Sequence, residues 1–203
     1  YKRQIQEGNG VPADGDLWVS YSVNKEDMWI SRIPVPVEIN ASAHADDDFS
    51  KNKSIAELTD WNIYSPVWAP VSLEDQWLKL QDKDPFDYAK VERKIPASKE
   101  LKVSFDLKAG QNNKGTLQIE FLDENGIACS RMELTDDGIF RLKGGSRFAN
   151  MMKYEAGKVY HVEAVLSTVD RNIQVYVDGK RVGLRMFLSL IHISEPTRQE
   201  AIS

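Results

Sequence analysis

Carboxylates capable of acid–base chemistry occur in the middle of the chain, and their spacing argues against a catalytic pair. Hydrolysis of a glycosidic bond needs two carboxylic groups facing each other across a cleft. Glu120, Asp123 and Glu124 come nearest to such a pair, in the segment EFLDE. Because Asp123 and Glu124 fall in a predicted hairpin turn, the three groups do not share one strand face. We expect them to be solvent-exposed or turn-forming groups, as we do for Asp106.

Nucleophilic catalysis of the serine or cysteine type is also poorly supported. His44 stands alone in a polar segment, and His161 begins a predicted strand without a candidate nucleophile elbow. Cys129 falls in a predicted strand, where we expect a small buried apolar residue. Because it is the single cysteine of the chain, an intrachain disulfide and a cysteine-based zinc site are excluded.

Aspartates cluster at two places where calcium is an alternative interpretation. Asp46, Asp47 and Asp48 are adjacent, whereas Ca²⁺ takes six or more oxygens from spaced positions. The spacing of Asp82, Asp84 and Asp87 is generic. We therefore expect no cofactor, and interpret the first group as part of a solvated linker.

Aromatic residues are the strongest indication of a ligand. A sugar ring stacks on an exposed aromatic platform while neighbouring polar side chains bond its hydroxyl groups. The alternative is that these aromatic residues belong to the core, as most tryptophans of β-sandwiches do, and Trp61 shares this ambiguity. Two polar residues after Gly144-Gly145 are expected in a loop that could line a concave face. The candidate glycan-binding residues are thus Trp68, Trp77, Tyr64, Arg147 and Asn150.

Short antiparallel strands are the elements that would position these side chains. From Tyr160 to Val182 apolar residues alternate with polar ones, which is typical of strands with one buried face. Asp178-Gly179 is a type I′ hairpin signal, and residues 170–172 supply a second turn. About nine or ten such strands recur with a turn every 8–12 residues and without a convincing helix, which predicts an all-β, antiparallel β-sandwich.

Composition limits the range of partners. The chain of 203 residues has a formal net charge of −5 and a pI near 5.3, which argues against nucleic acid. No apolar run approaches the roughly 18 residues of a membrane span. We expect neither a nucleic-acid partner nor a transmembrane segment.

The two ends of the chain resemble translated sequencing adaptor. Residues 1–4 (YKRQ) can be encoded by TATAAGAGACAG, whose reverse complement translates as LSLI, the sequence of residues 188–191. The longer tail LSLIHISEPTR is similar to the mosaic end and adaptor of a transposase-based library. We therefore expect residues 1–4 and 188–203 to be foreign, and the intervening chain to be a fragment cut at both ends.

The predicted domains begin with a hairpin. The segment DGDLWVSYSVNKEDMWISRI, residues 14–33, resembles the closing blade of a sialidase-like β-propeller with BNR-type repeats, although the Asp-box motif itself is not present. The resemblance implies that residues 5–37 are the last-blade hairpin of a truncated propeller. It also implies that the catalytic residues lie upstream, so no catalytic residue is assigned. Pro34 and Pro36 end the hairpin, and residues 38–60 are a polar linker.

The second domain, residues 61–187, resembles a concanavalin-type or laminin-G-like jelly roll. The closing pattern HVEAVLSTVDRNIQVYVDGKRVG carries most of this likeness. The resemblance implies a fold more than a function, because that sandwich hosts lectins, hydrolases and spacers.

Together these features predict the C-terminal part of a secreted bacterial glycan-processing protein, a sialidase-like glycoside hydrolase or lyase. The sandwich would be its accessory or carbohydrate-binding domain, packed against the missing propeller and located outside the cytoplasm, extracellular or periplasmic. One alternative is a non-enzymatic glycan-binding or adhesion module, and another is a structural spacer. An enzyme active within this chain itself is the least supported reading.

Overall fold

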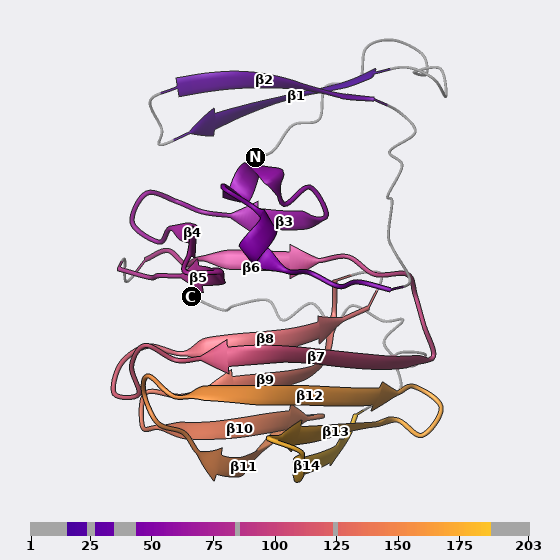
Figure 1. The fold of residues 1–203 in the computed structure, drawn as a ribbon. Helices are drawn as coiled ribbons and strands as arrows, with labels where there is room; N and C mark the ends of the chain where they lie inside the picture. Colours follow the sequence, from indigo (N-terminus) through magenta and orange to yellow (C-terminus); the bar gives the residue numbers. More distant parts are fainter. Residues whose placement is uncertain (1–15, 24–26, 35–43, 84–85, 124–125, 188–203) are drawn as a thin grey trace, which may run out of the picture. The chain divides into compact units, whose positions relative to one another are not determined.

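The computed structural model describes residues 16–23, 27–34, 44–83, 86–123 and 126–187 (Figure 1). The chain divides into two compact units, Tyr1–Pro96 and Ala97–Ser203, each of which is treated by itself. The segments expected to be adaptor, 1–4 and 188–203, lie outside the described residues. In the described part of the chain no helix is long and apolar enough to cross a membrane.

The first unit begins with the predicted hairpin. Strands β1 (Asp16–Val23) and β2 (Asp27–Pro34) pair antiparallel, with Tyr21 opposite Trp29 and Ser20 opposite Ile30. The side chains of Tyr21, Met28, Trp29 and Ile30 are exposed. The hairpin is thus confirmed, whereas its origin in a propeller stays a prediction.

Short elements make up the rest of the first unit. The described part of the predicted linker contains two 3₁₀ turns, η1 (Phe49–Lys51) and η2 (Ile55–Glu57), and the Asp48 side chain caps the first by accepting from the Ser50 amide. Strand β3 (Trp61–Tyr64) pairs with β6 (Lys90–Arg93), and β4 (Val71–Glu74) pairs with β5 (Trp77–Leu80). Leu58, Ala69 and Val71 are its buried apolar residues among those described.

The second unit is an antiparallel β-sandwich of two four-stranded sheets (Figure 1). One sheet has the strand order β11-β10-β9-β8 and the other the order β14-β13-β12-β7. The predicted all-β sandwich is confirmed. The strands are β7 (Glu100–Lys108), β8 (Leu117–Leu122), β9 (Ala128–Leu134), β10 (Ile139–Gly144), β11 (Arg147–Lys153), β12 (Val159–Ser167), β13 (Asn172–Val177) and β14 (Lys180–Met186).

Period-two alternation places the core between these sheets. Every second residue of β12 is buried from Tyr160 to Leu166, and the same holds for Ile173 to Val177 in β13. Met132 and Leu142, at 0% exposure, come from the inner face of the opposite sheet. Each fully buried aliphatic side chain stabilises the fold by about 1.5–3 kcal/mol, so these alternating positions hold the two sheets together.

Turn chemistry connects the strands as the sequence indicates. Asp178 and Gly179 have φ values of 49° and 76°, as a type I′ turn between β13 and β14 requires. Gly144 has another role. A Cβ atom at this position would lie 2.5 Å from the Met186 carbonyl oxygen and 2.6 Å from the Arg185 Cβ atom, so a glycine lets β10 approach β14 closely.

Candidate functional site

The paired strands β3 and β6 bring four polar or aromatic side chains to one face of a small sheet. Asn62 lies opposite Glu92, and Tyr64 lies opposite Lys90. Because side chains alternate along a strand, Asn62 and Tyr64 point to the same side, and so do Lys90 and Glu92. The intervening Ile63 and Val91 face the other way and are more buried than Asn62, Tyr64 and Lys90.

A hollow of about 300 Å³ lies on this face. Two tyrosines dominate it: the Tyr64 and Tyr88 rings have centroids 5.5 Å apart and planes tilted by 49°. Their exposed fractions are 47% and 58%, so both rings offer apolar surface to a ligand. The volume matches the lower end of ligand-binding sites, about 300–1,000 Å³. The lining residues are Asn62, Ile63, Tyr64, Tyr88, Lys90 and Glu92.

Asp87 bonds the Tyr64 side chain and the Tyr88 backbone. The Tyr64 hydroxyl donates to Asp87 Oδ1 at 3.0 Å, and the Tyr88 backbone amide donates to the same oxygen at 2.9 Å. The hydrogen bond to this carboxylate, together with smaller effects of desolvation and of the negative charge, raises the pKa of Tyr64 above its ordinary value. The Tyr64 hydroxyl therefore stays neutral, with its proton engaged by Asp87 and its oxygen open to a ligand donor.

Glu92 is the charged acceptor of the hollow. Lys90 Nζ lies 2.6 Å from Glu92 Oε1, and Asn62 Nδ2 donates to Glu92 Oε2 at 3.0 Å. The Lys90 hydrogen bond lowers the pKa of Glu92 most, with help from the Lys90 charge and from Asn62. An ionised carboxylate, an amide and an ammonium thus stand beside two aromatic rings. This set can stack on a sugar ring and bond its hydroxyl groups.

The tryptophan candidates lie outside this lining. Trp68, 66% exposed, lies in the turn between β3 and β4, where its carbonyl oxygen accepts from the Lys83 amide at 2.9 Å. Trp77 is half-buried on β5 opposite Glu74. The Trp61 ring packs against Phe49 with centroids 5.9 Å apart. Of the predicted glycan-binding residues, only Tyr64 lines the hollow.

Arg147 and Asn150 occupy a strand, so their predicted placement in a loop is wrong. Both belong to β11, and Asn150 lies opposite Arg141 of β10. The Gly144-Gly145 signal marks a tight hairpin rather than a long loop, because Gly145 takes a φ of 60° and β11 resumes at once. Both side chains are exposed.

Two of the carboxylates considered for catalysis have structural partners, and the third, Glu124, lies outside the described residues. Glu120 pairs with Arg131 on the neighbouring strand, through the Arg131 Nε atom at 2.7 Å. Asp123 accepts from the Ile127 amide at 2.7 Å, as a turn-forming residue does. Among the described residues, no group of three or more His, Cys, Asp or Glu side chains could hold a metal ion. Asp84 of the calcium alternative lies outside them.

Sequence reasoning missed a contact between a histidine, an aspartate and a serine. His161 Nδ1 lies 2.8 Å from Asp106 Oδ1, and its Nε2 lies 3.1 Å from Ser104 Oγ. The spacing of Ser104 and Asp106, two residues apart on one strand, was the available signal. The His161 and Asp106 side chains are 56% and 59% exposed on a sheet face. Because the strand amides there serve the β-ladder, they form no oxyanion hole, and water is not excluded.

Cys129 is partly buried, close to the expectation. Its thiol donates to the Phe121 carbonyl oxygen at 3.1 Å, and burial raises the pKa of the thiol. The neutral thiol is a poor nucleophile.

Two comparisons with known proteins found similarity to sialidase-like proteins. Residues 61–195 match the family described as "Sialidase-like, CBM domain". A solved structure titled "Sialidase" is similar at 90% sequence identity and a TM-score of 0.77, over 91% of this chain and 17% of that one. No curated protein matches.

The fold and the match define a carbohydrate-binding module of sialidase-like type. The chain belongs to the "Sialidase-like, CBM domain" family, which covers about two thirds of its residues. It spans about 17% of the length of the solved sialidase.

Proposed function

We propose that this chain is the carbohydrate-binding accessory part of a larger, sialidase-like, glycan-processing protein, and that it holds glycan in the Tyr64–Tyr88 hollow. The observation that carries the proposal is the pair of exposed tyrosine rings, 5.5 Å apart, in a hollow of about 300 Å³. Large aromatic residues in such a position leave apolar surface in water, which a ligand would remove.

The surrounding polar groups favour a sugar over an apolar ligand. Glu92 accepts hydrogen bonds, Lys90 and Asn62 donate them, and the oxygen of Tyr64 accepts one more. A sugar ring presents both an apolar C–H face and a rim of hydroxyl groups, which matches two rings bordered by acceptors and donors. Because the lining charges of Lys90 and Glu92 offset each other, the hollow suits a neutral sugar.

Glycan binding by the full chain tests this proposal. Glycan-array screening identifies a ligand, and calorimetry then compares the wild type with Tyr88→Ala, for which we expect about a tenfold loss of affinity. Tyr176→Ala is the matched control, since this tyrosine lies in the other unit and bonds Gln174. Equal affinities of the wild type and Tyr88→Ala would refute the site. A chain that binds no glycan at all would favour the structural-spacer alternative.

The parent protein would supply the chemistry. We propose that it is a secreted glycoside hydrolase or lyase, extracellular or periplasmic, whose catalytic residues lie outside this chain. The support is the solved sialidase, of which the chain matches 17%, and the β1–β2 hairpin. A two-stranded hairpin with exposed Tyr21, Trp29 and Ile30 is marginal alone, and would be stabilised as the closing strands of a propeller blade.

The coding sequence upstream tests whether the parent protein contains a propeller before this chain. We expect repeated four-stranded units at a spacing of roughly 40–50 residues before the hairpin. A different upstream architecture would contradict the propeller, and would leave the laminin-G-like sandwich as a free-standing adhesion module.

We also propose that residues 1–4 and 188–203 are translated adaptor. The support is the inverted repeat shared by the DNA that can encode residues 1–4 and 188–191. The family match runs to residue 195 and so overlaps the second segment. Sequencing the genomic locus decides the matter: a genuine gene that encodes LSLIHISEPTR after Phe187 would overturn the proposal.

A further inference from the structure

The outer face of the β11-β10-β9-β8 sheet carries two rows of aligned polar side chains. Strand register places Glu120 opposite Arg131, Arg131 opposite Lys143, and Lys143 opposite Phe148. The neighbouring row runs in the same way through Gln118, Glu133, Arg141 and Asn150. All eight residues alternate with inward-facing positions such as Met132 and Leu142, so their side chains share the face opposite the core.

The cationic side chains on this face differ in whether they have a carboxylate partner. Arg131 pairs with Glu120, and Arg141 forms a forked pair with Glu133, with Nε and Nη2 each 3.1 Å from a carboxylate oxygen. Lys143 is different: among the residues that the structure describes, no carboxylate lies within ion-pair distance of its ammonium group. Lys143 instead extends to within 5.5 Å of the centroid of the Phe148 ring.

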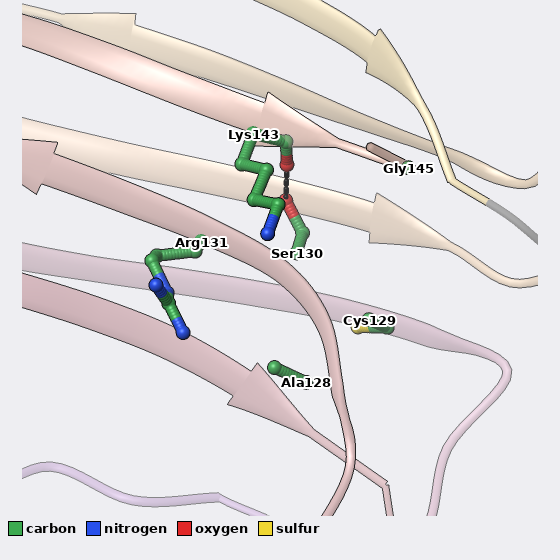
Figure 2. Close-up of a pocket in the computed structure, with 6 residues that line it drawn as sticks. All are labelled: Ala128, Cys129, Ser130, Arg131, Lys143 and Gly145. Atoms are coloured by element: carbon green, nitrogen blue, oxygen red, sulfur yellow. Dashed lines mark hydrogen bonds between the residues drawn. The ribbon is translucent and has the colours of Figure 1, made fainter. Parts of the chain in front are cut away.

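A small hollow lies beside this uncompensated charge (Figure 2). Its volume is about 70 Å³, and Arg131 and Lys143 are the two charged residues among the six that line it. Figure 2 shows them on neighbouring strands, with the Ser130 hydroxyl donating to the Lys143 carbonyl oxygen at 2.9 Å. The hollow is several times smaller than the roughly 300 Å³ at the lower end of ligand-binding sites, so it suits a charged substituent rather than a whole sugar.

Phe148 provides the apolar surface next to the hollow. Its side chain is 37% exposed, and the Arg141 guanidinium lies 4.2 Å from its ring centroid. Asn150, on the same strand two residues away, adds an exposed amide. A ring platform, an amide and an ammonium without a carboxylate partner among the described residues therefore occur together on one sheet face, in a chain whose net charge is −5.

We propose that this face is a second glycan-binding surface and that it selects acidic sugars. The anionic group, a carboxylate or a sulfate, would enter the hollow between Arg131 and Lys143, while the sugar ring lies over Phe148. The inference rests on the proposed carbohydrate-binding function for the class of ligand. It uses a different unit from the Tyr64–Tyr88 hollow, and the two sites would differ in preference, one for neutral and one for acidic sugars.

Binding of three trisaccharides to the full chain tests the proposal: one of galacturonic acid, one of sulfated galactose and one of neutral galactose. We expect both acidic ligands to perturb the backbone amide signals of residues 141–143 and 148–150 in nuclear magnetic resonance spectra, and the neutral ligand to leave them unchanged. Comparison of the two acidic ligands distinguishes carboxylate from sulfate. Because screening weakens ion pairs at a surface, their affinity falls as salt is raised.

Lys143→Ala isolates the ammonium group. We expect it to lower the affinity for the acidic trisaccharides about tenfold, as loss of a charge-assisted hydrogen bond does, and Lys143→Arg to restore most of it. Lys102→Ala is the matched control, since Lys102 is an exposed lysine on the other sheet, paired with Glu163 at 2.7 Å. Tyr88→Ala leaves acidic binding intact if the two sites are separate.

Three outcomes would overturn the inference. The first is that acidic ligands bind no more tightly than the neutral one, the second that Lys143→Ala and Lys102→Ala lose equal affinity, and the third that inorganic sulfate alone reproduces every spectral change of the sulfated sugar. Failure of the neutral sugar to bind at Tyr64–Tyr88, with acidic binding retained, would refute the proposed hollow and leave this surface standing. The nuclear magnetic resonance titrations use only the wild-type chain, so their result does not depend on how the variants fold.

Discussion

Asp87 fixes one of the two aromatic rings of the hollow, that of Tyr64, through a side-chain hydrogen bond. It accepts hydrogen bonds from the Tyr64 hydroxyl at 3.0 Å and from the Tyr88 amide at 2.9 Å. Because Tyr64 belongs to β3 and Tyr88 lies shortly before β6, Asp87 connects the two strands. Groups held in place before binding lose less conformational entropy when a ligand arrives. The Tyr64 ring is thus oriented by a residue that is not itself among those lining the hollow.

The Tyr64 pKa reports this contact directly. Since the hydrogen bond to the Asp87 carboxylate is the main cause of the raised pKa, Asp87→Asn, which replaces a charged acceptor with a weaker neutral one, should bring the pKa of Tyr64 part of the way back toward its ordinary value. A raised folded-state pKa means that the contact stabilises the fold below about pH 10 and that this contribution is lost as the pH rises through the folded-state value. Ultraviolet titration of the wild type, Asp87→Asn and Tyr64→Phe measures the effect. Identical curves for the wild type and Asp87→Asn would contradict it.

The Cys129 thiol should react slowly. Burial raises its pKa, so the thiolate is scarce at neutral pH, and the Sγ atom is engaged with the Phe121 carbonyl oxygen. We expect alkylation by iodoacetamide at about pH 7 to be at least tenfold slower in the folded chain than in denaturant. Equal rates in the two states would show that the thiol is exposed and unperturbed.

At the scale of elements, Tyr154 connects β11 to the turn between β9 and β10. Its hydroxyl donates to the Thr135 carbonyl oxygen at 2.7 Å and its amide donates to the Gly138 carbonyl oxygen at 2.9 Å. The side chain is buried, and desolvation raises the pKa of its hydroxyl. Tyr154→Phe removes the hydroxyl and leaves a buried carbonyl oxygen without that donor.

We expect Tyr154→Phe to lower the free energy of unfolding by about 1–2 kcal/mol. Chemical denaturation followed by fluorescence or circular dichroism measures the change. Tyr176→Phe is a suitable control, because the Tyr176 hydroxyl donates to Gln174 at a partly exposed site. If the two variants lose the same free energy of unfolding, the Tyr154 hydroxyl contributes no more to stability than the Tyr176 hydroxyl, which would contradict the prediction.

The close approach of β10 and β14 depends on Gly144. A Cβ atom there would meet backbone and side-chain atoms of β14 at about 2.5 Å, as given above, and one of those atoms is a carbonyl oxygen that cannot rotate away. Gly144→Ala should therefore destabilise the chain by about 1–3 kcal/mol. Gly110→Ala is the matched control, since nothing lies within 4 Å of its added Cβ. Equal melting temperatures for the two variants would contradict the steric argument.

Local chemistry explains which elements were predictable. The Asp178-Gly179 turn and the alternation of Val162, Ala164 and Leu166 depend only on residues close together in the sequence, and the structure confirms both. The hairpin between β4 and β5 was missed because its turn, Asp75-Gln76, takes positive φ values of 49° and 68° without a glycine. The placement of Asn150 was wrong because two glycines can open either a loop or a tight hairpin, and tertiary pairing decides.

The candidate site was predictable only in part. Tyr64 was found because it is an aromatic residue that could form a platform for a sugar ring. Tyr88 was missed, since its contact with Tyr64 depends on the register of β3 against β6, which pairs residues about 30 apart in the chain. No local pattern fixes a register of that kind.

At the scale of the whole molecule, the two units differ in their cores. Each of the thirteen buried residues of the main hydrophobic cluster lies in the Ala97–Ser203 unit, whereas the described buried apolar residues of the first unit are Leu58, Ala69 and Val71. Because burial of apolar area is the dominant stabilising contribution, the sandwich should have a higher free energy of unfolding than the first unit.

Hydrogen exchange measures this difference. We expect the amides of β12 and β13 to be the slowest to exchange, and those of β3 and β6 to exchange much faster, since the latter form a ladder of two strands only. Exchange of all four strands at one rate would instead indicate a single cooperative unit.

Chemical-shift mapping on the full chain is the most direct measurement of whether glycan binds at the Tyr64–Tyr88 hollow. A neutral oligosaccharide identified by array screening is titrated into isotope-labelled protein while the backbone amide signals are followed. We expect saturable shifts at residues 62–64 and 88–92 that disappear in Tyr88→Ala. Saturable binding that shifts signals elsewhere and leaves these residues unchanged would contradict it.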